Sequence, residues 1–386
     1  MNLRRVLILA DESADWIVAG LRQLDRLVLS LDEVGVENRE TAPIEVCLFW
    51  RHDVDPSRRW IPNDPRLTHL AFTSAPDDGP FDLVLTTRLF LYRKALQEFL
   101  SEGRASARPI VSGDRIYDFS DMQKHVPPRE GAREHIESAD AIPAIETRFL
   151  RGSGKSQDGL VSRYLNRPIS RAITRILLRY PVTPNAWTWL IFPIPIVAAL
   201  VLSRGTYWSF VWGLVLFQIF SVLDGCDGEI ARAKFMESEN GRRLDDLFDV
   251  LSNILLVLGL GFGLHSAHPH FGGIYLAEGM AAALLIAVTE WFLARAPVAE
   301  VGVDSLGGTL YPRHRAFVER SGLLAFGEKF ASLVMQLTKR DVAILFFVFL
   351  AAIGLPSLIL HLLFLVTAVT LSFALRGGSS APPLDG

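Results

Sequence analysis

Long apolar segments fill the second half of the chain and limit the folds that are open to it. Six of them approach the length at which a helix crosses a bilayer, about 20 residues, near residues 186–203, 207–227, 243–264, 274–295, 341–355 and 357–375. The first 150 residues are mixed and charged instead. The sequence therefore predicts a multi-domain chain, with a cytosolic α/β domain followed by an all-α integral membrane domain of six transmembrane helices.

The predicted boundaries follow these changes in composition. Residues 1–150 form the α/β domain, residues 151–183 a linker with a juxtamembrane amphipathic helix, residues 184–376 the membrane domain, and residues 377–386 a disordered tail. In the segment 158–180 an arginine recurs at every fourth position from Arg163 to Arg179, with apolar residues on other faces. Such a helix is typical of the membrane interface, where it meets anionic head groups.

The distribution of basic residues predicts the orientation of the membrane domain. The loop 265–273 has no Lys or Arg, whereas the opposite side carries Arg232, Arg242, Arg243 and further basic residues. By the positive-inside rule, that side faces the cytoplasm. We therefore expect a protein of the cytoplasmic membrane whose N-terminal domain lies on the cytoplasmic side. A formal net charge of −3 gives no case for nucleic acid as a partner.

Four aspartates stand where two of the apolar segments meet a polar stretch. Asp224 and Asp227 are three residues apart, and Asp245 and Asp249 are four apart. On helices, each pair projects from one face. Acidic side chains at a membrane boundary are costly unless they are paired, solvated or bound to cations. Two facing carboxylate pairs predict a site for hard divalent cations, most naturally Mg²⁺. The alternative is a charged, solvated loop between two membrane helices.

Small residues and one arginine lie between the two pairs. Glycine and alanine, at Gly228, Ala231 and Gly241, let a ligand approach the backbone closely. Arg232 is placed to bind a phosphate with two hydrogen bonds. The full pattern is D-x-x-D-G-x-x-A-R, eight residues, then G-x-x-x-D-x-x-x-D. It resembles the motif of the CDP-alcohol phosphotransferase (CDP-alcohol phosphatidyltransferase) family, and every fixed position is occupied.

The resemblance extends to the start of the first apolar segment, where a P-N-x-x-T element includes Asn185 and Thr188. It implies a transferase that moves a phospho-alcohol group from a CDP-alcohol to an acceptor hydroxyl and releases CMP. It also implies two Mg²⁺ ions, or Mn²⁺ in their place, held by Asp224, Asp227, Asp245 and Asp249, with Asp249 as the catalytic base. The implied contacts to the nucleotide and diphosphate are those of six residues: Gly228, Ala231, Arg232, Gly241, Asn185 and Thr188.

The first 150 residues alternate strands with helices, which predicts a mostly parallel sheet. Strands are expected at residues 5–10, 44–50, 81–87 and 109–113, and helices at 16–35, 90–102 and 142–150. The opening strand, the stretch VAGLRQLDRLVLSLDEVGVE at 18–37 and the strand ending LVLTTRL resemble a sugar-nucleotide cytidylyltransferase. The domain departs from that family in two places. The loop after the first strand is DESADW instead of glycine-rich, and Thr86 and Thr87 stand where the family has a metal-binding aspartate. We interpret it as a degenerate nucleotidyltransferase-like domain that serves as a scaffold or forms a homodimer.

Two substrate classes remain open. The fusion of these two domains resembles enzymes that make di-myo-inositol phosphate phosphate from CDP-inositol and inositol phosphate. The alternative is a phosphatidyltransferase that uses CDP-diacylglycerol in phospholipid biosynthesis. Lys339 and Arg340, at the start of the fifth apolar segment, are candidates for binding an acceptor phosphate or for ordinary charge anchoring. A cation transporter is an alternative from a different class. Its ion site is expected near the bilayer midplane, whereas the aspartates lie at the ends of the apolar segments, which favours an enzyme.

Overall fold

The computed structural model describes residues 3–37, 42–73, 81–92, 95–101, 133–152, 160–295 and 340–378. The chain divides into two compact units. The first consists of Met1–Ser153, Arg175–Pro181 and Ile230–Met236, and the second of Gly154–Thr174, Val182–Glu229 and Glu237–Gly386.

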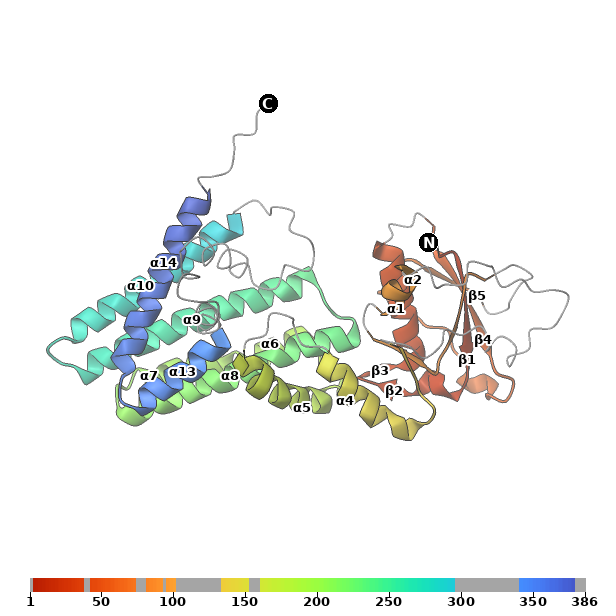
Figure 1. The fold of residues 1–386 in the computed structure, drawn as a ribbon, viewed down its shortest axis with the longest axis horizontal. Coiled ribbons are helices and arrows are strands. Elements are labelled where there is room, and N and C mark those ends of the chain that lie inside the picture. The colour runs from red at the N-terminus through yellow and green to blue at the C-terminus, as the bar shows by residue number, and fades with distance from the viewer. Residues whose placement is uncertain are drawn as a thin grey trace, which may run out of the picture. The chain divides into compact units, whose positions relative to one another are not determined.

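A parallel sheet is the centre of the first unit (Figure 1). Its four strands lie in the order β5-β4-β1-β6 and have the bounds β5 Leu70–Thr73, β4 Ile44–Trp50, β1 Arg5–Ala10 and β6 Leu83–Thr86. All three pairings are parallel. The helix α1, Gln23–Glu37, buries Leu24, Leu27 and Leu31 in the core that the sheet also lines. The strand order turns back at β1, and in open parallel sheets ligand sites lie at the carboxyl ends of the strands beside such a point.

The remaining elements of the first unit are short. They are the hairpin strands β2 Ile17–Val18 and β3 Leu21–Arg22, the antiparallel pair β7 Leu89–Leu91 and β8 Arg133–His135, and the helices α2 Ala95–Ser101 and α4 Ile142–Gly152. The predicted parallel α/β domain is confirmed, and β5 is a strand that sequence reasoning missed. The candidate strand at 109–113 lies outside the described residues.

The first predicted helix was placed too early, at residue 16 instead of Gln23. Residues 17–22 form the β2–β3 hairpin instead. Its turn has left-handed backbone at Ala19 (φ 48°) and Gly20 (φ 81°). A right-handed helix cannot continue through two such residues. A side chain at Gly20 would also lie within 3.0 Å of the carbonyl oxygen of Leu178.

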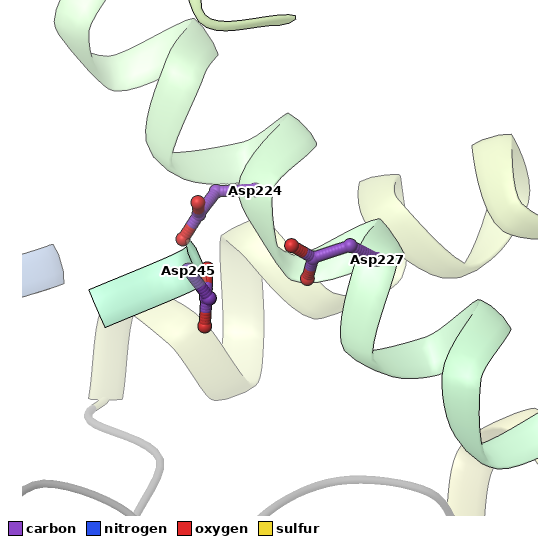
Figure 2. Close-up of side chains that lie close together, drawn as sticks. All are labelled: Asp224, Asp227 and Asp245. Carbon is purple, nitrogen blue, oxygen red and sulfur yellow. The ribbon is translucent and has the colours of Figure 1, made fainter. Parts of the chain in front are cut away.

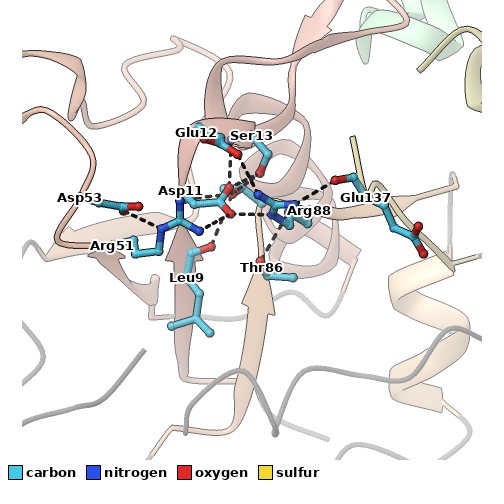
Figure 3. Close-up of polar contacts among 10 residues, drawn as sticks. Leu9, Asp11, Glu12, Ser13, Arg51, Asp53, Thr86, Arg88 and Glu137 are labelled. Atoms are coloured by element: carbon cyan, nitrogen blue, oxygen red, sulfur yellow. Dashed lines mark hydrogen bonds and ion pairs between the residues drawn. The ribbon is translucent and has the colours of Figure 1, made fainter. Parts of the chain in front are cut away.

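An ion cluster occupies the carboxyl ends of the central strands (Figure 3). Asp11 directly follows β1, and its carboxylate accepts hydrogen bonds from the Ser13 backbone N–H (2.9 Å) and from Arg88 Nε (2.6 Å). Arg51, which directly follows β4, lies 3.7 Å from the same carboxylate. Burial by itself raises the pKa of Asp11, but the hydrogen bonds from Ser13 and Arg88 outweigh it, so the pKa lies below its ordinary value. Asp11 is the first residue of the DESADW loop, which replaces the glycine-rich loop that the sequence comparison expects after the first strand.

Replacing Asp11 by Asn is expected to lower the free energy of unfolding by about 2 kcal/mol at pH 7, because two hydrogen bonds lose their charge and Arg88 loses a buried partner. A depressed folded-state pKa stabilises the fold above the unfolded pKa of about 3.9. That contribution disappears as pH falls through the folded pKa. Thermal unfolding of the full chain should therefore show the difference between the variant and the wild type shrinking as pH falls below the ordinary aspartate pKa of about 3.9. An equal difference at all pH values would contradict the role of the carboxylate charge. Asp53→Asn, at an exposed position, is the matched control.

The first unit also contains the end of a long helix, α8, Tyr207–Lys234. Phe235 has left-handed backbone (φ 55°) and ends the helix, and the Met236 N–H donates to the Ala231 carbonyl at 2.9 Å. Two guanidinium groups bind the carbonyls that the end leaves open. The fully buried Arg26 donates to Ala233 O (3.0 Å), and Arg66 donates to Lys234 O (2.6 Å) and Phe235 O (2.9 Å). Positive charge at the carbonyl end of a helix is stabilising.

The second unit is helical throughout its described residues. Its helices are α5 Arg167–Leu177, α6 Pro184–Ile191, α7 Pro193–Leu202, α8, α9 Glu239–Ala267, α10 Gly272–Arg295, α13 Arg340–Ala352 and α14 Pro356–Gly378. Two of these, α5 and α8, end in the first unit. Among the described residues, four helical stretches are long and apolar enough to cross a membrane: 184–202, 207–234, 239–267 and 272–292. They match the first four predicted spans. The fifth and sixth correspond to shorter apolar helices within α13 and α14.

The helices of this unit bury one apolar cluster and expose another apolar surface. Phe217 of α8, Leu260 of α9 and Ile359 of α14 belong to the buried cluster. Large apolar side chains such as Trp189, Trp212 and Leu284 are more than half exposed. Apolar surface of this extent is unusual on a soluble monomer and is typical of a surface that meets lipid.

Candidate metal centre

Three aspartates from two helices meet at one point (Figure 2). Asp224 and Asp227 lie on α8, and Asp245 lies on α9. One carboxylate oxygen from each lies within 4.8 Å of the others. Asp227 is buried, and Asp224 and Asp245 are half-buried. The structure thus brings together three of the four aspartates that the sequence predicts to bind metal.

The chemistry of this group suits a hard divalent cation. At an effective dielectric constant of about 20, each pair of ionised carboxylates at this spacing repels by about 3 kcal/mol. A cation between them reverses the sign of that energy. Mg²⁺ prefers oxygen ligands and is commonly bound through a small number of carboxylates together with phosphate oxygens of a substrate. The three side chains therefore fit the predicted ion, with positions left for a diphosphate.

A short connection turns the chain from α8 into α9 and brings the two aspartate pairs together. Four residues, 235–238, separate the helices. Ser238 caps the start of α9, because its hydroxyl accepts a hydrogen bond from the Gly241 N–H at 3.0 Å. The left-handed backbone of Phe235 fixes the end of α8, and the Ser238 cap fixes the start of α9. Asp245 thereby enters α9 about two turns after the cap, opposite the Asp224–Asp227 face of α8.

The helix α6 joins the site through two hydrogen bonds to α8. Thr183 caps α6, and Pro184 occupies its first turn. Trp187 Nε1 donates to the carbonyl of Leu223, beside Asp224, at 2.9 Å. Thr188 Oγ1 donates to Asp227 Oδ2, also at 2.9 Å. The structure therefore places Thr188 as a partner of a candidate metal ligand, and Trp187 is a site residue that sequence reasoning missed.

Asn185 and Gly241 lie against one another. A Cβ atom at Gly241 would stand 3.0 Å from Asn185 Oδ1 and 3.0 Å from Ser238 Oγ. The absence of a side chain at Gly241 therefore lets α6 approach the start of α9. Gly228, Ala231 and Arg232 follow Asp227 along the last turns of α8, where Ala231 is buried and the other two are half-buried.

Asp249 lies one turn beyond Asp245 on α9 and is half-buried, but it is not part of the three-carboxylate group. The side chain of Asp246, also on α9, is exposed and pairs with Arg242 at 3.3 Å. Phe248, also on α9, stacks on Phe192 with ring centroids 4.1 Å apart. This contact packs α9 against the residue that joins α6 to α7, beside the site. Lys339 and the side chain of Arg340 lie outside the described residues, so the candidate acceptor site stays a prediction.

A comparison with known protein families finds a match in the helical part of the chain. The family model for CDP-alcohol phosphatidyltransferase matches residues 181–374, which are 194 of the 386 residues of the chain. The protein belongs to the CDP-alcohol phosphatidyltransferase family. The four long apolar helices and the family together identify an integral membrane protein.

Three relatives carry the name "Bifunctional IPC transferase and DIPP synthase". The protein from Thermococcus kodakarensis is 40% identical over 100 residues, which are 26% of this chain and 21% of the relative. The protein from Rubrobacter xylanophilus is 35% identical over 155 residues, 40% of this chain and 34% of the relative. The protein from Aquifex aeolicus is 42% identical over 100 residues, 26% and 22% of the two chains. The alignments thus cover about a third or less of each relative.

Proposed function

We propose that this protein is a membrane-embedded transferase that moves a phospho-alcohol group from a CDP-alcohol to an acceptor hydroxyl and releases CMP. The observation that carries the proposal is the meeting of Asp224, Asp227 and Asp245 within 4.8 Å, inside the segment that matches the family. The reaction needs negative charge on a diphosphate to be neutralised before an oxygen nucleophile approaches. A carboxylate cluster beside small residues and an arginine meets that need.

The proposed roles follow the order of the site along the two helices. Asp224, Asp227 and Asp245 would hold Mg²⁺, with Asp249 shared between a second ion and the acceptor, and Mn²⁺ is the alternative metal. Bound Mg²⁺ would supply charge neutralisation on the diphosphate. Arg232 would bind a phosphate oxygen of the donor. Gly228, Ala231, Gly241 and Asn185 would line the cytidine side, and Thr188 would orient Asp227 through its 2.9 Å hydrogen bond.

Asp249 would act as the general base. It would accept the proton of the acceptor hydroxyl while that oxygen forms a bond to the β-phosphorus of the CDP-alcohol. The bond from the β-phosphorus to the bridging oxygen breaks, and CMP leaves with the electron pair. Asp249 suits this role because it is half-buried on the same helix as Asp245 and stands outside the three-carboxylate group.

We propose CDP-inositol as the donor and an inositol phosphate as the acceptor. The names of the relatives support this choice, because each includes IPC transferase and DIPP synthase.

The front domain would act as a scaffold, or as the contact between two copies of a homodimer, and not in nucleotidyl transfer. The Asp11 cluster supports this, because the carboxylate at the end of β1 already binds Arg88 and Arg51. A triphosphate would have to displace Asp11 from both arginines.

We further propose that α13 and α14 complete six spans and that the aspartates face the cytoplasm. The basic residues near the site, including Arg232, Arg242 and Arg243, support this orientation. An even number of spans returns the end of α14 to the side of the site.

Release of CMP by the purified full chain tests the proposal. CDP-inositol and CDP-diacylglycerol are offered separately with inositol phosphate, with Mg²⁺ or with a chelator. We expect Mg²⁺-dependent release with CDP-inositol. Release with CDP-diacylglycerol alone would make the protein a phosphatidyltransferase of phospholipid biosynthesis. No release with either donor, from protein that binds Mn²⁺ and remains folded, would contradict the proposed donors.

A further inference from the structure

Glu229 is a fully buried acid inside the motif, at a position that the motif leaves open. Its side chain is 0% exposed. One carboxylate oxygen accepts hydrogen bonds from Ser170 Oγ (2.8 Å) and Arg167 Nη1 (3.1 Å), and the other accepts one from Thr174 Oγ1 (2.8 Å). All three donors belong to α5. Such a carboxylate is costly to bury unless all its partners are present, so this arrangement requires an explanation.

The partners of Glu229 form one polar stripe on α5. Arg167, Ser170 and Thr174 are buried at successive spacings of three and four residues, and Asn166, which directly precedes α5, is buried as well. Each contacts α8: Asn166 Oδ1 accepts a hydrogen bond from Gln218 Nε2 at 2.8 Å, and the other three bind Glu229. Three apolar residues of the same segment, Leu165, Ile169 and Ile176, are exposed instead. The polarity of α5 is therefore inverted relative to a helix on a soluble protein.

Glu229 and the metal aspartates occupy opposite sides of α8. At 3.6 residues per turn, Glu229 lies about 140° around the helix from Asp224 and about 200° from Asp227. Arg167 also reaches α8 near Asp224, where its Nη1 lies 3.5 Å from the carbonyl of Gly225. The stripe of α5 thus binds the back of the helical turns whose front carries the metal ligands.

We propose that Glu229 is a positioning residue, and that its buried contacts with Arg167, Ser170 and Thr174 set the rotation of α8 that directs Asp224 and Asp227 toward Asp245. This inference rests on the proposed function of the aspartates. Helix packing alone leaves α8 free to rotate by small amounts, because apolar contacts are non-directional. A charged pair with two further hydrogen bonds is directional, and it permits one rotation only.

The rotation of α8 is expected to affect metal affinity because the metal is sensitive to the positions of its ligands. Mg²⁺ requires near-ideal octahedral positions for its oxygen ligands. A change in the rotation of α8 moves Asp224 and Asp227 together relative to Asp245, because the first two lie on one helix and the third on another. Substitution of a residue that orients a metal ligand without touching the metal typically lowers metal affinity by about 10–100-fold. Glu229 acts on both ligands of α8 at once.

Four purified full-chain variants test the proposal: Glu229→Gln, Arg167→Gln, the double variant R167Q/E229Q and the control E239Q/R242Q. The control neutralises an exposed ion pair with N–O distance 2.7 Å near the same site. Binding of Mn²⁺ in the absence of substrate, followed by electron paramagnetic resonance, reports on the ligands independently of turnover. Mg²⁺-dependent CMP release then separates kcat from KM for the donor.

We expect each single variant to bind Mn²⁺ about tenfold more weakly and to lose kcat about 10–100-fold, with a change in donor KM below about threefold. The double variant should recover Mn²⁺ affinity to within about threefold of the wild type, because it leaves no uncompensated buried charge and the two amides can hydrogen-bond. The control should bind Mn²⁺ as the wild type does.

Unchanged Mn²⁺ affinity in E229Q, with only a lower melting temperature, would show that the contact is merely structural and would overturn the proposal. A folded double variant as weak as E229Q would also overturn it. If E229Q does not fold, the double variant and R167Q decide the question by the same criteria. Failure of the proposed function looks different: the wild type would then release no CMP, while the effects of these variants on Mn²⁺ binding would still stand.

Discussion

Replacing Asp249 by Asn is expected to lower kcat for CMP release by about 10²–10⁴-fold, the range in which a positioned general base contributes. Asparagine has nearly the same shape but cannot accept the proton of the acceptor hydroxyl. Binding of the CDP-alcohol should change little, because the three grouped carboxylates, Asp224, Asp227 and Asp245, remain. Steady-state kinetics with the donor varied at saturating Mg²⁺ measure both quantities.

The chain offers a close control for this experiment in Asp246. It has the same side chain on the same helix, but it is exposed and pairs with Arg242. Asp246→Asn should retain kcat within about threefold, as expected for a surface position. Wild-type turnover in the Asp249 variant would remove Asp249 as the base. Equal losses in both variants would point to a general effect of charge on α9 instead.

The second large effect is expected for Asp227→Asn, at the buried member of the metal group. Its loss should weaken Mn²⁺ binding by about 100-fold or more, since even partners outside the ligand set cost 10–100-fold. Mg²⁺-dependent turnover should fall in parallel and recover partly at high Mg²⁺. Electron paramagnetic resonance of Mn²⁺ measures the affinity directly, and the Mg²⁺ dependence of CMP release measures its consequence.

Thr188→Val provides a graded comparison with Asp227→Asn. It keeps the shape of the side chain but removes the hydrogen bond to Asp227 Oδ2. The expected loss of Mn²⁺ affinity is about tenfold, smaller than for the ligand itself. A loss confined to the KM of the CDP-alcohol, with normal Mn²⁺ binding, would instead return Thr188 to the nucleotide contact that the sequence implies.

The three-carboxylate group could be predicted because it depends on local geometry. Spacings of three and four residues put each aspartate pair on one helical face, and a short polar connection brings two successive helices together. The strands at 5–10 and 44–50 were predictable for a similar reason, since buried parallel strands are continuous apolar runs. In both cases the signal is local, because the aspartate pattern spans 26 residues, from 224 to 249, and the two strands have six and seven residues.

The features that could not be predicted depend on partners distant in the sequence. Glu229 looks like one more charge in a polar stretch until α5 is seen to cover it. The arginine period of 158–180 indicated a helix with its charges toward head groups, but the structure buries Arg167 against α8 and exposes Ile169. Periodicity shows that a helix has two faces without showing which face the protein covers. The early start predicted for α1 failed because a left-handed turn at Ala19 has no strong local signal.

The two arginines at the end of α8 have a consequence for how such a chain can be shortened during evolution or in the laboratory. Removing residues 1–152 would delete Arg26 and Arg66 and leave the carbonyls of Ala233, Lys234 and Phe235 without these donors. These carbonyls follow Arg232 of the motif directly. The loss of the first domain is therefore expected to destabilise the end of α8 that carries the motif. Stabilisation of this helix end is by itself a reason for a transferase to retain the domain, whether or not the domain has an activity of its own.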